Sequence, residues 1–256
     1  MYYVGIDIGS TASKTVVTGD REMKFVLPTG WSSKETASEI ASRLLDQGID
    51  VMSEGVRVAA TGYGRVAVDY ADFVITEITC HARGAHFLNP EVRTVIDIGG
   101  QDSKVIRLDE NGAVANFVMN DKCAAGTGRF LEMMARTMEM SLDDMGKAGL
   151  SYKEDITISS MCTVFAESEV VSLIAQNKAT DDIVHGLNKA VASKTAALAK
   201  RVGGEERYMM TGGVSKNQGL VKTLEEKLGT TLVISDKAQI CGALGAALFA
   251  KDMVTE

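Results

Sequence analysis

Short apolar runs separated by turns follow one another along the chain in two similar series. The first series predicts strands at residues 2–8, 14–18 and 23–27, followed by an amphipathic helix at 34–47. The second predicts strands at residues 94–98, 103–108 and 113–119, followed by helices from Gly126. A hairpin turn, Glu110-Asn111-Gly112, joins the last two of these strands. This repeated order predicts an α/β fold built from two related lobes.

The rest of the chain completes the second lobe and returns to the first. The pattern predicts a helix at 181–202, a strand at 207–210, another helix after 211–215 and a last helix at 242–250. Small residues dominate the last helix, so we expect it to lie close to another backbone and to pack back across the lobe junction. Pro90 precedes the second series and marks the boundary. The predicted lobes are residues 1–90 with about 237–256, and residues 91–236.

An eight-residue motif connects the first two strands of both series. Residues 7–14 read Asp-Ile-Gly-Ser-Thr-Ala-Ser-Lys, and residues 97–104 read Asp-Ile-Gly-Gly-Gln-Asp-Ser-Lys. Glycine in such a turn brings backbone N–H groups against a phosphate, and the preceding aspartate can hold the magnesium ion of that phosphate. A hairpin without a ligand would explain one copy. Two copies favour two turns that face each other across one nucleotide.

Composition narrows the class of protein. The 256 residues carry a formal net charge of −7, with no concentrated tract of lysine and arginine, which argues against nucleic acid or an anionic membrane as the main partner. No apolar stretch approaches the roughly 20 residues that cross a bilayer, and the N-terminus begins with a strand pattern instead of a signal peptide. We expect a cytoplasmic protein whose four cysteines form no structural disulfide.

Two cysteines, Cys123 and Cys162, stand just before helical patterns. A helix N-terminus lowers the pKa of a thiol and favours a thiolate as nucleophile or metal ligand, and Ser159 and Ser160 are plausible caps for the second helix. The alternative is that each cysteine fills a tight junction. Two thiolates are half of what a cubane iron–sulfur cluster or a structural zinc needs. A twofold dimer would supply four.

The remaining cysteines and the histidines suggest less chemistry. Cys80 and Cys241 lie in apolar helical segments and are interpreted as core residues. Cys80 beside His81 is a weaker alternative metal pair. His86 and His185 are interpreted as surface or packing residues.

A second glycine motif, Gly62-Tyr63-Gly64-Arg65-Val66-Ala67, follows the apolar run 56–60. It fits the loose dinucleotide pattern G-x-G-x-x-A, and Glu77 lies at a tolerable distance for a ribose carboxylate. Because the first strand of this lobe already carries a phosphate turn, nicotinamide or flavin binding is the less favoured interpretation. No G-x-x-x-x-G-K-[ST] occurs, which excludes a P-loop enzyme at the motif level.

The paired turns resemble the phosphate motifs of the actin, heat-shock-protein and sugar-kinase ATPases, and Met-Thr-Gly-Gly-Val at 210–214 resembles their adenosine motif. The resemblance implies two duplicated actin-like (ribonuclease H-like) lobes with a nucleotide cleft between them. It implies that Asp7 and Asp97 hold magnesium through water and that Lys14 contacts the terminal phosphate. The residues implied in nucleotide binding are Gly9, Ser10, Thr11, Gly99 and Gly100 for the phosphates, and Gly212 and Gly213 for the adenosine.

Gln101 or Asp102 would orient the attacking water, a choice that stays open. Lys104 repeats the position of Lys14 without necessarily repeating its role.

The cysteine segments narrow the resemblance to one family. Residues 95–102, 120–130, 159–169 and 211–214 closely resemble the ATP-dependent activators (component A) of 2-hydroxyacyl-CoA dehydratases, which are related to the ATPase subunits of benzoyl-CoA reductase. The resemblance runs essentially from end to end. It implies a homodimer with one oxygen-sensitive 4Fe-4S cluster held by Cys123 and Cys162 of both chains, and ATP or ADP with Mg²⁺ as the other cofactors. It also implies ferredoxin or flavodoxin as electron donor and a two-subunit iron–sulfur dehydratase or reductase of anaerobic metabolism as acceptor.

The activity that this resemblance implies is ATP hydrolysis coupled to one-electron transfer. ATP binding would rotate the lobes and the helices that carry the cysteines, and hydrolysis would make the transfer directional. The main alternative is a small-molecule kinase of the same fold, such as a sugar-type kinase, which would need a carboxylate base and would have no use for the two cysteines. A regulatory ATPase with a zinc or dithiol switch is the third possibility.

Overall fold

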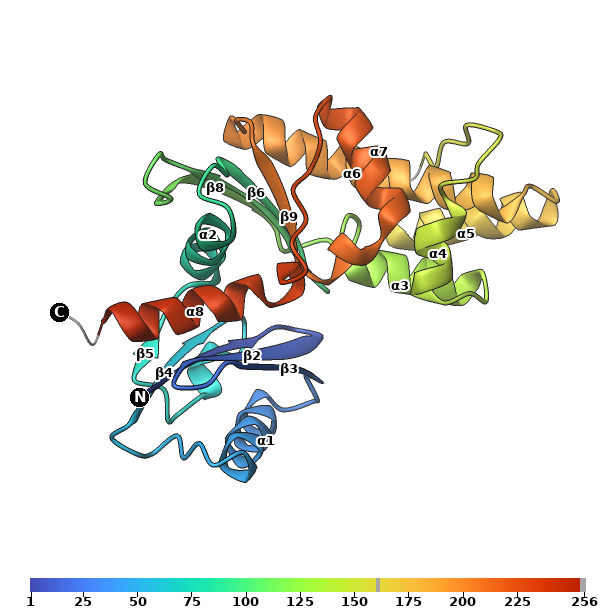
Figure 1. Ribbon diagram of the computed structural model, residues 1–256. Coiled ribbons are helices and arrows are strands. Elements are labelled where there is room, and N and C mark those ends of the chain that lie inside the picture. Colours follow the sequence, from blue (N-terminus) through green and yellow to red (C-terminus); the bar gives the residue numbers. More distant parts are fainter. Residues whose placement is uncertain (160–161, 254–256) are drawn as a thin grey trace. The chain divides into compact units, whose positions relative to one another are not determined.

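A computed structural model describes residues 1–159 and 162–253 and divides the chain into two compact units (Figure 1). Unit 1 consists of Met1–Val92, Leu108–Ala115 and the chain from Ser235 onward, and unit 2 consists of Arg93–Arg107 and Asn116–Ile234. The predicted lobes differ from these units mainly at residues 108–115, which the prediction placed in the second lobe. This hairpin end belongs to unit 1 because Gly112 packs against His86, whose ring would lie 2.3 Å from a Cβ at that position.

Unit 1 is built around a five-stranded sheet in the order β3-β2-β1-β4-β5. Its strands are β1 (Tyr2–Ile8), β2 (Ala12–Gly19), β3 (Met23–Pro28), β4 (Val56–Thr61) and β5 (Phe73–Val74). β1 pairs antiparallel with β2 and parallel with β4. Alternate residues of β1 face opposite sides, so Val4, Ile6 and Ile8 pack with helix α1 (Ser33–Asp46).

The last helix, α8 (Cys241–Asp252), covers the other face of this sheet and packs on helix α2 (Glu77–Leu88). The approach is close, as its small residues predicted. A Cβ at Gly5 of β1 would lie 1.9 Å from the Ala243 carbonyl oxygen, and one at Gly245 would lie 1.8 Å from the Cys80 carbonyl oxygen. These partners of α8, namely β1, β2, β4 and α2, are all elements of unit 1.

The sheet of unit 2 repeats this arrangement with four strands in the order β8-β7-β6-β9. The strands are β6 (Thr94–Ile98), β7 (Ser103–Leu108), β8 (Val114–Asn120) and β9 (Tyr208–Thr211). β6 pairs antiparallel with β7 and parallel with β9, just as β1 pairs with β2 and β4. The duplication predicted from the sequence is therefore a duplication of sheet topology.

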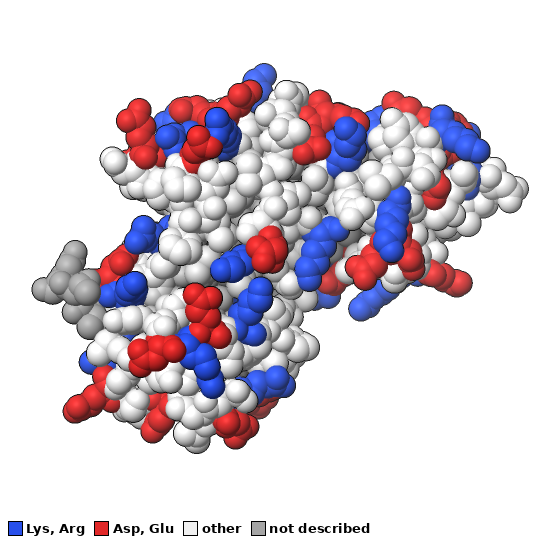
Figure 2. All heavy atoms as spheres, in the orientation of Figure 1, with Lys and Arg blue, Asp and Glu red and all other residues white. Residues whose placement is uncertain are grey.

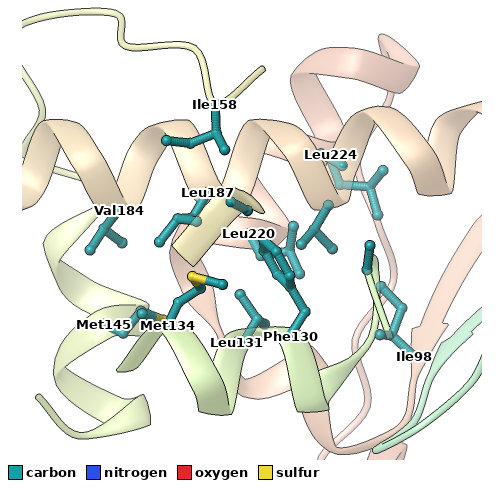
Figure 3. Close-up of a cluster of buried hydrophobic side chains, with 14 of the residues drawn as sticks. Ile98, Phe130, Leu131, Met134, Met145, Ile158, Val184, Leu187, Leu220 and Leu224 are labelled. Atoms are coloured by element: carbon teal, nitrogen blue, oxygen red, sulfur yellow. The ribbon is translucent and has the colours of Figure 1, made fainter. Parts of the chain in front are cut away.

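The helices of unit 2 enclose a large buried cluster (Figure 3). They are α3 (Gly128–Thr137), α4 (Leu142–Ala148), α5 (Thr163–Ala175), α6 (Thr180–Val202) and α7 (Gln218–Leu228). Phe130, Leu131 and Met134 of α3 point into this cluster with Leu187 of α6 and Leu220 of α7. Each such buried side chain stabilises the fold by about 1.5–3 kcal/mol, which holds α3 firmly in unit 2.

The outer surface shows mixed charge. On the face drawn in Figure 2, acidic and basic side chains are interspersed and do not separate into large patches of one sign. Among the helices in the described part of the chain, none combines the length and apolar character needed to span a membrane.

Candidate nucleotide and cysteine sites

The two copies of the eight-residue motif form the same turn. Between β1 and β2 the Gly9 amide donates to the Ala12 carbonyl at 3.1 Å, and between β6 and β7 the Gly99 amide donates to the Asp102 carbonyl at 2.9 Å. The residues at the two tips are partly or fully exposed: Ser10, Thr11, Gly100 and Gln101. Both tips are thus accessible to a ligand.

Each turn is flanked by a buried aspartate and a lysine in the same register. Asp7 stands opposite Lys14 across β1 and β2, and Asp97 stands opposite Lys104 across β6 and β7. The Nζ–Oδ2 distances are 3.2 Å for the first pair and 3.1 Å for the second. The sequence repeat therefore places an acid–base pair beside both turns.

The two lysines nevertheless differ in their surroundings. The Lys104 side chain is 3% exposed and pairs with a second carboxylate, Asp102 Oδ2, at 2.9 Å. The Lys14 side chain keeps 17% exposure. Lys104 is consequently held inside unit 2 by two acids, whereas Lys14 can reach a ligand at the turn of its own unit.

The turn after β9 completes the site of unit 2. The Thr211 hydroxyl donates to Asp97 Oδ1 at 2.8 Å. Gly212 adopts φ +85°, and a Cβ there would lie 2.3 Å from the Ile98 carbonyl oxygen, so this position requires glycine. A Cβ at Gly213 would meet nothing within 4 Å. Gly212 thus permits the close approach to β6, and Gly213 leaves open space beside the turn.

The Gly99–Gly100 turn of unit 2 is bonded directly to the start of α3. The Gly128 amide donates to the Gly99 carbonyl at 2.9 Å, and the Arg129 amide donates to the Gly100 carbonyl at 2.7 Å. The first N–H groups of a helix have no partner within the helix. In α3 the turn carbonyls provide these partners, so a shift of the turn is transmitted to the helix.

Cys123 lies in the loop between β8 and α3, not at the helix start. The N-cap of α3 is Thr127, and Gly126 takes φ +87° in the intervening turn. The Asn120 side-chain amide donates to the carbonyls of Cys123 at 2.9 Å and Ala125 at 3.1 Å. The helix predicted from Gly126 begins at Gly128, so Cys123 lies somewhat farther from the helix start than the sequence indicated. The Asn120 bonds nevertheless hold its loop, and Cys123 is exposed.

Cys162 stands directly before α5, as the sequence predicted, and it is exposed; the structure further shows that it is the N-cap residue of this helix. The prediction that Ser159 caps this helix is wrong. Its amide and hydroxyl instead donate to the Glu169 carboxylate of α5 at 3.0–3.1 Å, while Ser160 lies outside the described residues. A further bond at 2.9 Å, from the Thr137 hydroxyl to Glu167, ties α3 to α5.

Residues 4–250 match the BadF/BadG/BcrA/BcrD ATPase family. The chain belongs to this family. It is 44% identical over 260 residues to a 2-hydroxyisocaproyl-CoA dehydratase activator of Clostridioides difficile, covering 100% of this chain and 97% of the relative.

Comparison with solved structures supports the same family membership. Component A of the Acidaminococcus fermentans (R)-2-hydroxyglutaryl-CoA dehydratase has a TM-score of 0.93 at 44% identity, with all of both chains covered. The Clostridium difficile activator with bound ADPNP has a TM-score of 0.92 at 42% identity and covers 100% of this chain and 96% of that chain. A Streptomyces griseus ROK family glucokinase, at 14% identity and a TM-score of 0.58, shows the fold alone.

Membership of the BadF/BadG/BcrA/BcrD ATPase family confirms the resemblance to dehydratase activators and the predicted class of duplicated actin-like ATPase lobes. Within this ATPase, unit 1 carries Asp7, Gly9, Ser10, Thr11 and Lys14. Unit 2 carries the remaining predicted site residues, namely Asp97, Gly99, Gly100, Gln101, Asp102, Cys123, Cys162, Gly212 and Gly213.

The Cys80–His81 pair is poorly suited to metal binding. Cys80 is completely buried against α8, and this burial raises the pKa of its thiol to about 12. A metal ligand must be a thiolate, so burial disfavours that role and supports the core interpretation. Cys241 is buried as well.

The structure does not support dinucleotide binding by residues 62–67, because the long helix that this motif requires does not follow them. A three-residue 3-10 helix, Arg65–Ala67, follows Gly64, whereas the dinucleotide motif places the pyrophosphate at the N-terminus of a longer helix. Sequence reasoning missed that Gly62 lies against the Asp7 carboxylate. A Thr-Gly pair occurs at 61–62 as well as at 211–212, but it also occurs at 18–19, 29–30 and 127–128, so the pair gave only a weak signal.

Proposed function

We propose that this protein is an ATP-hydrolysing activator that passes single electrons from ferredoxin or flavodoxin to a 2-hydroxyacyl-CoA dehydratase or a related CoA-ester reductase. The observation that carries the proposal is its full-length similarity to proteins named as dehydratase activators. Two exposed cysteines add independent support. Cys123 precedes α3, whose first amides donate to the Gly99–Gly100 turn, and Cys162 caps α5, which is hydrogen-bonded to α3.

The paired turns supply the groups for Mg²⁺ and ATP. In this proposal Asp7 and Asp97 hold the magnesium ion through water, and Lys14 contacts the terminal phosphate. The backbone of Gly9, Ser10, Thr11, Gly99 and Gly100 binds the phosphates, and Gly212 and Gly213 admit the adenosine. The solved relative with bound ADPNP supports nucleotide binding in this family.

Gln101 is the better candidate to orient the attacking water. Asp102 is already engaged, because its Oδ2 pairs with Lys104 at 2.9 Å and its Oδ1 would lie 2.7 Å from a Cβ at Gly99. Gln101 is exposed at the tip of the same turn. Phosphoryl transfer to water requires such a positioning group close to the terminal phosphate.

Replacing Gln101 by leucine is therefore expected to lower the ATPase rate by about 100-fold. Asp102→Asn should retain most of the rate but unfold at a lower temperature, since it weakens the pair with buried Lys104. Steady-state hydrolysis at saturating MgATP and thermal unfolding of both variants test this assignment. A 100-fold rate loss in Asp102→Asn with an active Gln101→Leu would reverse it.

The cysteines fit an iron–sulfur cluster shared by two chains. Within residues 1–159 and 162–253 no group of three or more His, Cys, Asp or Glu side chains could hold a metal ion, so a single chain offers only part of a ligand set there. Cys123 and Cys162 of two symmetry-related chains would provide the four thiolates of a 4Fe-4S cluster. Such a cluster, when bound, would accept and release one electron at a time.

Hydrogen bonds within unit 2 offer a route from nucleotide to cysteines. The Gly99 and Gly100 carbonyls accept from the first amides of α3, and Asn120 holds the adjoining Cys123 loop. A phosphate that draws the turn toward itself also displaces the start of α3. The α3–α5 bond between Thr137 and Glu167 would carry this displacement to the helix that begins at Cys162.

The surface of α5 supports a homodimer. Val164, Phe165 and Val171 are exposed by 62%, 66% and 53%, and the first two follow Cys162 closely in the sequence. Sharing one cluster would bring two copies of this helix start together and bury these side chains.

Phe165→Glu is therefore expected to convert the dimer to a monomer and to prevent cluster binding, because a charge cannot be buried unpaired at the interface. Phe87→Glu is the matched control, since Phe87 of α2 is also exposed, by 54%. Sedimentation analysis and iron content measure both effects. A Phe165→Glu protein that stays dimeric and keeps its full iron content would show that α5 is not part of the interface.

Activation of a separately purified dehydratase tests the whole proposal. With ATP, Mg²⁺ and reduced ferredoxin, catalytic amounts of the anaerobically purified protein should activate 2-hydroxyisocaproyl-CoA dehydratase or (R)-2-hydroxyglutaryl-CoA dehydratase, the partners named for its relatives. Activation that does not require ATP would contradict it. ATP-dependent phosphorylation of a sugar by the iron-free protein would support the kinase instead.

A further inference from the structure

The turn after β4 in unit 1 repeats the turn after β9 in unit 2. Both strands end in threonine, and the next residue is a glycine in the left-handed region, Gly62 with φ +86° and Gly212 with φ +85°. The sheet registers also agree, because Thr61 stands opposite Asp7 and Thr211 stands opposite Asp97. Unit 1 therefore contains a counterpart of the adenosine turn.

The two turns share a pair of hydrogen bonds to the carbonyl of their first glycine. In unit 2 the Ser215 amide and hydroxyl donate to the Gly212 carbonyl at 3.3 Å and 2.7 Å. In unit 1 the Arg65 amide and Nη1 donate to the Gly62 carbonyl at 3.4 Å and 2.9 Å. A 3-10 helix follows in each case. In this pair of bonds a guanidinium in unit 1 takes the place of a hydroxyl in unit 2. The turns also differ at their threonines, because the Thr211 hydroxyl donates to Asp97 whereas the Thr61 hydroxyl makes no such bond to Asp7.

This turn lies against the Asp7 carboxylate. A Cβ at Gly62 would be 2.3 Å from Asp7 Oδ1 and 2.6 Å from the Ile8 carbonyl oxygen, and the Gly64 amide donates to that same Ile8 oxygen at 2.9 Å. Arg65 fixes the carbonyl of Gly62, so it determines how closely the turn approaches Asp7. Asp7 also pairs with Lys14 at 3.2 Å, and a Cβ at Gly242 of α8 would lie 3.2 Å from its Oδ2.

The two aspartates are therefore supported differently. Asp97 is held by the Thr211 hydroxyl and by a lysine that stays buried between two acids. Asp7 loses support from Lys14 whenever Lys14 turns to a phosphate, and the closely packed Gly62 turn then helps to hold the carboxylate in place. We propose that Arg65 is a positioning residue for Asp7 that fixes this carboxylate for magnesium binding, an inference that rests on the proposed ATPase function.

The test compares Arg65→Ala with Arg65→Ser, because serine makes the equivalent bond in unit 2. Affinity for ADPNP is measured by calorimetry with and without Mg²⁺, together with the Mg²⁺ concentration for half-maximal ATP hydrolysis. Loss of a residue that orients a metal ligand typically weakens metal binding by about 10-fold or more. Arg65→Ala should therefore lose about 10-fold in the affinity gained from Mg²⁺ and keep its Mg²⁺-free affinity, whereas Arg65→Ser should stay close to the wild type.

Several results separate the possibilities. Arg43→Ala, an exposed arginine of α1 paired with Glu39, should leave every value unchanged. If Arg65→Ala lowers only the unfolding temperature, the residue is structural and the inference fails. If both Arg65 variants lose Mg²⁺-free affinity equally, Arg65 contacts the nucleotide directly, which also overturns it. A wild-type protein that neither binds ADPNP nor hydrolyses ATP would instead refute the proposed function.

Discussion

Replacing either Cys123 or Cys162 by serine is expected to remove the iron from the protein. The wild-type dimer should contain about four irons and four acid-labile sulfides after strictly anaerobic purification, because each chain would provide two of the four thiolates. Losing one cysteine per chain leaves two ligands per dimer. Iron and sulfide analysis of the two variants and the wild type measures the effect.

Cys80→Ala and Cys241→Ala are the matched controls, since both thiols are buried within unit 1. These variants should keep the full iron content. An iron-free wild type that still hydrolyses ATP after attempted reconstitution would contradict the electron-transfer proposal and favour the sugar-type kinase. Stoichiometric zinc in place of iron would favour the regulatory ATPase.

Replacing the two repeated lysines by methionine is expected to affect different properties, stability for Lys104 and the ATPase rate for Lys14. Lys104→Met leaves Asp97 and Asp102 without their shared buried cation, which costs about 3–5 kcal/mol and lowers the melting temperature by about 10 °C. Lys14→Met should fold normally but hydrolyse ATP about 100-fold more slowly, because it loses a cation placed for the developing phosphate charge. Thermal unfolding and steady-state hydrolysis distinguish the two.

Lys24→Met serves as the control for both lysine variants, since Lys24 is an exposed residue of β3. It should match the wild type in melting temperature and in rate. A Lys14→Met protein with the wild-type rate would contradict the catalytic role of Lys14. A Lys104→Met protein that melts at the wild-type temperature would contradict the structural role of Lys104.

The nucleotide elements were the part of the site most accessible from the sequence. A phosphate turn is a local structure, so the repeated Asp-x-Gly motif contains its aspartate, glycines and lysine within eight residues. The glycine motif at residues 62–67 was recognised, but its contact with Asp7 was not, because Asp7 lies on another strand. Only the parallel pairing of β1 with β4 brings Thr61 and Gly62 to that aspartate.

The cysteine segments were predicted with less accuracy. The place of Cys162 just before a helix followed from the helical pattern after it, and the structure confirms this, although the cap is Cys162 itself and not Ser159. The distance of Cys123 from its helix did not follow, because Ala and Gly fit a helix start and a turn almost equally well. The bond between Ser159 and Glu169 spans ten positions and depends on how α5 is oriented.

By itself the sequence determined the duplicated α/β order, the two repeated Asp-x-Gly turns and the family, because these depend on local motifs and on strand periodicity. The tertiary structure decided which of two candidate side chains is accessible to a ligand. Lys14 and Lys104 occupy the same motif position, yet Lys104 is buried by a second acid and Lys14 is not. Asp102 and Gln101 are neighbours, yet Asp102 is paired with Lys104 whereas Gln101 is exposed. Burial and long-range pairing set these differences, and neither is encoded in a local motif.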